Sequence, residues 1–206
     1  MKPILFNTEM VQAILDRKKT VTRRVIKGLP QDAKRIGWDM DTGNIKSYGE
    51  AMFQSNCIMI TKKCKYLIGD ILYVRETWQK SPAGTYLYKT DNSGNLSNGH
   101  VYKWEPSIHM PKEAARIFLR VTDVKIERLQ DITLSDVLKE GLEIEKYVST
   151  PLMKKFSNLW DTTVNKKEIN QYGWDANPYV WVYEFEVISK EEAMKESEYK
   201  CQKKNS

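Results

Sequence analysis

The longest regular pattern in the chain is an alternation of apolar and polar residues from 117 to 129. The run reads Ile-Phe-Leu-Arg-Val-Thr-Asp-Val-Lys-Ile-Glu-Arg-Leu and alternates over most of its length. Because successive side chains of a strand point to opposite faces of a sheet, this pattern predicts a half-buried strand. We expect a long, twisted strand here.

Shorter strands and a few helices are predicted on both sides of this run. Apolar runs indicate strands at 58–60, 71–74 and 180–188, and strands at 86–89 and 101–104 flank a polar turn at 91–95 as a hairpin. Helices are expected from Asn7 or Thr8, from a capping box of Thr133 and Asp136, and from Thr150-Pro151. Strands and helices do not alternate regularly, which favours an α+β fold over a doubly wound sheet.

We expect a single domain over residues 1–188. Residues 28–56 are mixed polar sequence with turn signals, and they indicate a loop excursion or a weak hairpin. Residues 189–206 form a charged C-terminal tail without sustained apolar periodicity, which is expected to fray.

The charge balance favours an anionic partner. Lys and Arg number 33 against 27 Asp and Glu, a net charge of +6. The three cysteines are odd in number and lack zinc spacing, so we expect free thiols, no metal and a cytoplasmic location. No signal peptide, membrane span, phosphate loop or dinucleotide fingerprint is evident, and no cofactor or membrane partner is expected.

The densest chemical signal is the basic run 17–24, Arg-Lys-Lys-Thr-Val-Thr-Arg-Arg. Lys and Arg contact phosphates by charge and by the fork geometry of the guanidinium, and hydroxyls add hydrogen bonds. The run therefore fits either a solvated basic turn or a contact with nucleic acid or a nucleotide.

This run carries a resemblance to the ASCH family. Lys19, Thr22 and Arg24 match the signature G-x-K-x-x-T-x-R, with Arg17 in place of the glycine, and residues 69–72, Gly-Asp-Ile-Leu, match the following strand. Phage-type members are matched further at 75–78, 106–111, 127–129, 140–141 and 174–178, although Glu113 stands where an aromatic residue often follows the Met-Pro pair. The resemblance covers nearly the whole chain.

The resemblance implies a PUA-like β-barrel of mixed strands with flanking helices, and RNA, a nucleotide or a nucleoside as ligand. Some ASCH proteins are amidohydrolases that remove the acetyl group of N4-acetylcytidine with a threonine, a lysine and a glutamate. Those roles would fall on Thr22, Lys19 and Glu140. A threonine hydroxyl becomes a nucleophile when a base takes its proton. Burial or neighbouring cations can lower the pKa of a lysine enough for its amine to act as that base.

Several of these residues have a plainer interpretation. Glu140 in a last helical turn is more often an exposed carboxylate, and whether Lys19 and Thr22 converge depends on the loop geometry. Arg75 and Glu76 could line the mouth of a cleft or form a surface ion pair. His109 is more often a structural hydrogen-bonder, and only the resemblance makes it a candidate.

The aromatic and arginine residues complete the candidate ligand-binding set. Arg23 and Arg24 supply charge, and Trp78 and Trp104 lie beside charged segments where they could stack on bases. Trp160 and Trp181 are assigned to packing. Trp174 and Asn177 lie in a segment that is expected to be a loop and could rim a cleft.

Three functions follow as hypotheses. The first is binding of RNA or a nucleotide or modified nucleoside through a basic cleft. The second is an amidohydrolase acting on N4-acetylcytidine-type substrates, whereas a ribonuclease has no pair of histidines to support it. The third is a phage structural or host-interaction protein. The sequence does not predict the oligomeric state.

Overall fold

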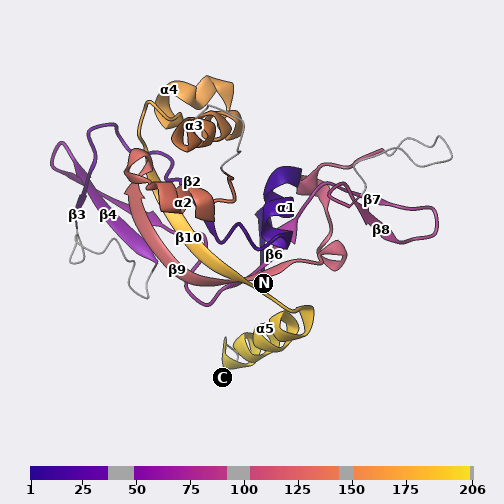
Figure 1. The fold of residues 1–206 in the computed structure, drawn as a ribbon. Coiled ribbons are helices and arrows are strands. Elements are labelled where there is room, and N and C mark those ends of the chain that lie inside the picture. The colour runs from indigo at the N-terminus through magenta and orange to yellow at the C-terminus, as the bar shows by residue number, and fades with distance from the viewer. Residues whose placement is uncertain (37–48, 92–102, 144–150, 205–206) are drawn as a thin grey trace. The chain divides into compact units, whose positions relative to one another are not determined.

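The computed structural model describes residues 1–36, 49–91, 103–143 and 151–204 (Figure 1). The chain divides into two compact units. Unit 1 contains residues 1–17, 70–120 and 186–206, and unit 2 contains residues 18–69 and 121–185. Two long strands, β9 (Phe118–Arg128) and β10 (Tyr179–Ile188), contribute residues to both. The single domain expected over 1–188 stays a prediction.

Unit 1 is built on strands that lie far apart in the sequence. Strand β1 (Lys2–Leu5) runs parallel to β6 (Ile71–Arg75), and β6 pairs antiparallel with the start of β9. Between β1 and β6 in the sequence, helix α1 (Thr8–Leu15) begins where the side chain of Asn7 accepts a hydrogen bond from the Met10 amide, as the sequence predicts. The short 3₁₀ turns η1 (Ser107–His109) and η2 (Lys112–Ala114) precede β9.

The hairpin predicted from 86–89 and 101–104 is wrong in its pairing. Strand β8 (Tyr86–Tyr88) pairs antiparallel with β7 (Trp78–Lys80), whose sequence carries no strong strand signal. The Trp78 amide and carbonyl also form backbone hydrogen bonds with Glu105. Glu105 therefore pairs with β7, and not with β8 as the predicted hairpin required. Residues 101 and 102 lie outside the described chain.

The charged C-terminal segment forms helix α5 (Lys190–Lys204) where a fraying tail was expected. Ala193 is fully buried in a core cluster with Ile188 and Ile71. Arg120 forms ion pairs with Glu186, Glu192 and Glu196. Tertiary packing and ion pairs with a distant arginine stabilise this helix, and neither leaves a periodic signal in the local sequence.

Unit 2 contains the candidate site. Strand β2 (Val21–Val25) pairs antiparallel with β10, and β3 (Lys34–Ile36), β4 (Glu50–Ser55) and β5 (Ile58–Lys63) form a separate antiparallel sheet. Within residues 28–56, where a loop excursion or weak hairpin was expected, 34–36 and 50–55 are paired strands, and 37–48 lie outside the described residues. Figure 1 shows α2 (Leu134–Lys139), α3 (Leu152–Thr163) and α4 (Ile169–Tyr172) gathered near one end of β10. The short turns η3 (Leu129–Asp131) and η4 (Lys166–Glu168) lead into α2 and α4.

The core of unit 2 joins β2, β10 and the helices. Val21 and Val182 pack with Val137 of α2 and with Phe156 and Trp160 of α3. The burial of Trp160 and of Trp181 confirms their assignment to packing. This core holds the face of β2 that carries Val21 against α2.

The expected closed β-barrel is contradicted. The described strands form three sheets, with the orders β1-β6-β9-β10-β2, β3-β4-β5 and β7-β8. Strands β1 and β2 are the two ends of the five-stranded order, and residues 34–63 pair among themselves instead of extending it. The fold is α+β with open sheets.

Within the described residues, no helix is both long and apolar enough to cross a membrane.

The capping box predicted at Thr133 is confirmed and fixes the start of α2. The Thr133 hydroxyl accepts from the Asp136 amide at 3.2 Å, and the Asp136 carboxylate accepts from the Thr133 amide at 3.2 Å. Two amides at the start of the helix are thereby satisfied.

We predict that Thr133→Ala lowers the free energy of unfolding by about 1 kcal/mol, because one of these amides loses its acceptor. Ser135→Ala is the matched control, since Ser135 is exposed inside the same helix. Urea unfolding followed by circular dichroism measures both. Equal stability of the two variants would show that the cap contributes nothing.

Candidate functional site

The site begins at the short connection between α1 and β2. Arg17 has a φ of 59°, the left-handed conformation that glycine adopts most easily. The ASCH signature has its glycine at this position. The chain then forms an isolated antiparallel bridge between Lys19 and Glu140, and the Thr20 amide donates to the Lys139 carbonyl at 2.8 Å. The backbone thus fixes Lys19 against the C-terminal end of α2.

Lys19 and Glu140 form a buried ion pair. The Lys19 ammonium lies 2.5 Å from one Glu140 carboxylate oxygen and donates to the Glu140 carbonyl at 3.0 Å. Their side chains are 0% and 6% exposed. The interpretation of Glu140 as an exposed helix-end carboxylate is therefore wrong, and the convergence of Lys19 with Glu140 is observed.

Arg23 extends this pair into a network. Its guanidinium donates through Nη1 to the second Glu140 oxygen at 3.1 Å and through Nε to Glu127 at 2.7 Å. Nη2 is 3.7 Å from Asp136 and 2.7 Å from Glu127, without a hydrogen bond of good geometry. Two cations and three carboxylates thus meet in the interior, and each charge has a partner of opposite sign.

Burial and charge shift the pKa of Lys19 in opposite directions. Burial lowers the pKa of Lys19 most strongly, Glu140 raises it, and Arg24 and Arg23 lower it further. The net direction is downward from the ordinary value of 10.5. A lysine of this kind loses its proton more readily than an exposed one, as a base requires.

Thr22 and Arg24 lie on the opposite face of β2 from Arg23, because side chains alternate along a strand. In the register with β10, Thr22 stands opposite Tyr183. Burial lowers the pKa of Arg24, while Tyr66, Glu140 and Tyr183 oppose that shift. No hydrogen bond joins the Thr22 hydroxyl to Lys19 or Glu140 in the part of the chain that the structure describes.

A hollow of about 330 Å³ adjoins the network. Three basic residues, Arg23, Arg24 and Lys27, line it together with the aromatic residues Trp160 and Tyr172. The Lys27 ammonium pairs with Glu168 at 2.7 Å on the exposed rim. The hollow presents the exposed Lys27 beside a floor that includes the two buried rings, whereas Lys19 lies in the interior.

Five of the predicted site residues belong to unit 1 and form other contacts: Arg75, Glu76, Trp78, Trp104 and His109. Glu76 is buried and receives two hydrogen bonds from Arg116, at 2.9 and 3.0 Å. Arg75 donates to the Ile108 carbonyl at 3.1 Å, and His109 is exposed in η1. Glu76 thus forms an interior ion pair with Arg116. It was expected either to line the mouth of a cleft or to form an ion pair on the surface.

The two candidate stacking tryptophans of unit 1 are only partly exposed. Trp78 packs against Tyr86 with ring centroids 5.7 Å apart, and its indole nitrogen is buried without a hydrogen bond in the described chain. Trp104 is half-buried next to the bridge between Trp78 and Glu105. The packing of Trp78 favours a structural role.

Asn177 supports the loop before β10. Its φ of 43° is left-handed, its side-chain oxygen accepts from the Gln130 amide at 2.8 Å, and its carbonyl accepts from Arg128. Trp174 packs edge-on against Phe156 at 6.0 Å. Both residues hold the loop in place and do not reach the network.

Sequence reasoning missed five contributors to the site: Lys27, Glu127, Asp136, Trp160 as a wall residue, and Tyr172. Glu127 was only part of a matched segment, yet its position one residue before the end of the alternating strand β9 places a carboxylate at a strand end. Asp136 was assigned to the cap of α2 and serves Arg23 as well. Tyr172 gave no signal, because its role depends on how α4 packs.

No group of His, Cys, Asp and Glu side chains in the described ranges could hold a metal ion. The chain matches no protein-family model, no curated protein and no solved structure.

We predict that Glu140→Gln lowers the free energy of unfolding by about 3 kcal/mol or more, because it leaves two buried cations without their shared carboxylate. Lys19→Met is expected to cost less, since Glu140 keeps Arg23 as a partner. Denaturant unfolding measures both variants.

Glu168→Gln is the matched control, because the Lys27–Glu168 pair is exposed. We expect it to change stability by less than about 1 kcal/mol. A Glu140→Gln variant as stable as this control would show that the buried network is not an important source of stability.

Proposed function

We propose that this protein binds a nucleotide or modified nucleoside, free or within RNA, in the hollow beside the Lys19–Glu140 network. The observation that supports this most directly is the lining of the hollow by Arg23, Arg24 and Lys27 together with Trp160 and Tyr172. Cations favour a phosphate, and aromatic rings favour a base. The net charge of +6 and the resemblance to ASCH domains point to the same class of ligand, and a cytoplasmic location is part of the proposal.

The burial of the network limits which residues contact the ligand. Lys19 and Arg23 have side chains 0% and 1% exposed, so a phosphate on the surface does not reach them. The Arg24 side chain lies on the other face of β2, and Lys27 is exposed. Lys27 is therefore the proposed ligand contact, and the network holds β2 in place behind it.

We predict that Lys27→Gln weakens the binding of cytidine monophosphate about tenfold, the loss expected for one hydrogen bond to a charged group. Lys34→Gln is the matched control, since Lys34 is also exposed in unit 2 but lies in β3 and does not line the hollow. Isothermal titration at two salt concentrations measures the affinity, which should fall as salt rises. If both variants bind as tightly as the unaltered protein, Lys27 is not a ligand contact.

A second candidate is the amidohydrolase, which the lowered pKa of Lys19 favours. In that reaction the Thr22 hydroxyl attacks the acetyl carbon of N4-acetylcytidine while its proton passes to the Lys19 amine. The C–N bond breaks, cytidine leaves with a proton, and water hydrolyses the acetyl ester on Thr22 to acetate. The reaction requires a Thr22–Lys19 hydrogen bond that forms with substrate bound, as happens in other catalytic sites.

We predict that the purified protein releases cytidine from N4-acetylcytidine if this second function holds, and that Thr22→Ala and Lys19→Ala abolish the release. The rate should rise with pH and level off below pH 10.5, because the base must be unprotonated and its pKa lies below that value. Chromatography of the products over a pH series measures both. Release that survives Thr22→Ala would exclude Thr22 as the nucleophile, and no release would leave binding alone.

A further inference from the structure

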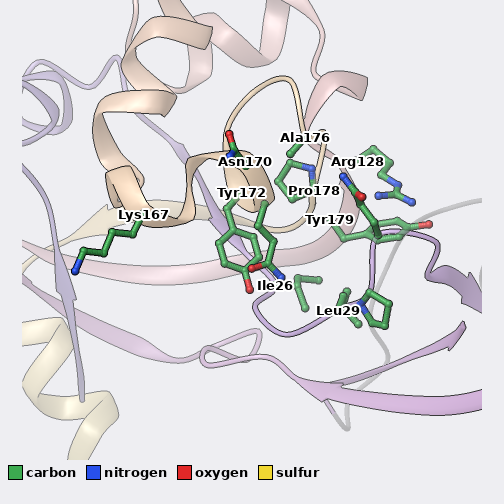
Figure 2. Close-up of a pocket in the computed structure, with 12 residues that line it drawn as sticks. Ile26, Leu29, Arg128, Lys167, Asn170, Tyr172, Ala176, Pro178 and Tyr179 are labelled. Atoms are coloured by element: carbon green, nitrogen blue, oxygen red, sulfur yellow. The ribbon is translucent and has the colours of Figure 1, made fainter.

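A second pocket, of about 290 Å³, lies in unit 2 where the chain leaves β2 and enters β10 (Figure 2). Its walls come from the residues after β2, the end of β9, the start of β10 and helix α4. The volume is near the lower end of ligand pockets, about 300 Å³, and suits a small planar group. None of the predicted site residues lines this pocket.

The floor of the pocket is apolar and partly aromatic. Tyr172 and Pro178 are buried, and Ile26 and Leu29 add aliphatic surface. The Tyr172 hydroxyl accepts from the Gly28 amide at 3.0 Å, which ties the segment after β2 to α4. The walls are therefore held in place without a ligand.

Arg128 supplies a fixed flat cation at one side of the pocket. Its guanidinium lies over the Tyr179 ring, 3.8 Å from the ring centroid, and donates to the carbonyls of Asn177 at 3.1 Å and Ala33 at 3.2 Å. Figure 2 shows Arg128 beside Tyr179, with Lys167 on the far side of Tyr172. A planar ring system stacks well on such an arginine and aromatic platform.

Three amide side chains, Gln31, Asn170 and Gln171, line the pocket and are exposed. Their side chains make no hydrogen bond within the described chain. Each amide offers two donors and an acceptor, the complement of the edge of a nucleobase. A purely apolar partner, such as a proline-rich peptide, would form no hydrogen bonds with the three amides and no ion pair with Arg128 or Lys167.

The pocket and the hollow of the proposed function have a residue in common. Tyr172 lines both, and Ile26 of the pocket follows Arg24 of the hollow by two residues. Lys27, which lines the hollow, directly follows Ile26 in the sequence. A nucleic-acid strand bound at the hollow would therefore reach the pocket over a short distance, past the basic side chain of Lys27.

We propose that this pocket binds one unpaired base of single-stranded RNA, stacked against Tyr172 and the Arg128–Tyr179 pair and hydrogen-bonded by the amides. Lys167 contacts a flanking phosphate. The inference rests on the proposed function and deepens it, because it makes the ligand a strand with a second bound nucleotide. Double-stranded RNA keeps its bases stacked inside the helix and cannot fill the pocket.

The test measures binding of a fluorescent ten-nucleotide single-stranded RNA by anisotropy. Ala176→Phe places a ring in the pocket, and we expect it to weaken binding about tenfold, as when one stacked base is lost. The double variant Asn170→Ala, Gln171→Ala changes only exposed side chains and is expected to weaken binding about fivefold. Affinity for a duplex of the same sequence should not change in either variant.

Photocrosslinking of the same RNA carrying 4-thiouridine locates the base directly, and the crosslink is expected within residues 167–179. Unchanged single-strand affinity in both variants, with Lys27→Gln weakened, would overturn the pocket and leave the proposed function in place. An unaltered protein that binds cytidine monophosphate but no RNA would overturn the pocket as well. Loss of duplex and single-strand affinity together would also overturn it, since the effect would not depend on an unpaired base.

Discussion

The arrangement of the site depends on one carboxylate, Glu140, that holds two cations inside the protein. Lys19 comes from the connection before β2 and Arg23 from β2 itself, so the same side chain fixes the start and the middle of that strand. Removing charges from water is costly, and only close partners offset that cost. Glu127 and Asp136, both partly exposed, give Arg23 two further partners of opposite charge. Strand β2, which contributes residues to the hollow, is thus held by contacts at several points along its length.

Local patterns in the sequence predicted local structure well. The alternation at 117–129 gives β9, the Thr133 and Asp136 spacing gives the cap of α2, and Asn7 caps α1. These features depend on residues a few positions apart. Pairing between distant segments was predicted less well, as in the expected barrel and in the hairpin at 86–104. Strand order depends on which segments bury their apolar faces together, and that is not encoded in the spacing of any one segment.

In the candidate site, too, residues close together in the sequence were predicted better than partners from distant segments. Lys19, Arg23 and Arg24 could be chosen from the sequence because they are consecutive or nearly so and all basic. Glu140 is 121 positions from Lys19 and has the local appearance of an exposed helix end, so its burial could not be read from its neighbours. The ASCH resemblance was the source of its candidacy. Arg128 and Tyr172 were not singled out at all, because stacking partners are defined by tertiary contacts alone.

The left-handed backbone at Arg17 restricts which residues that position can hold. A β-branched side chain such as valine or isoleucine there would be strained, whereas glycine, asparagine and aspartate adopt this conformation readily. Lys18 and Lys19 follow immediately, so a residue that forces an ordinary φ would turn the Lys19 side chain away from Glu140. Among natural variants of this chain, tolerance at position 17 should therefore follow backbone preference and not charge.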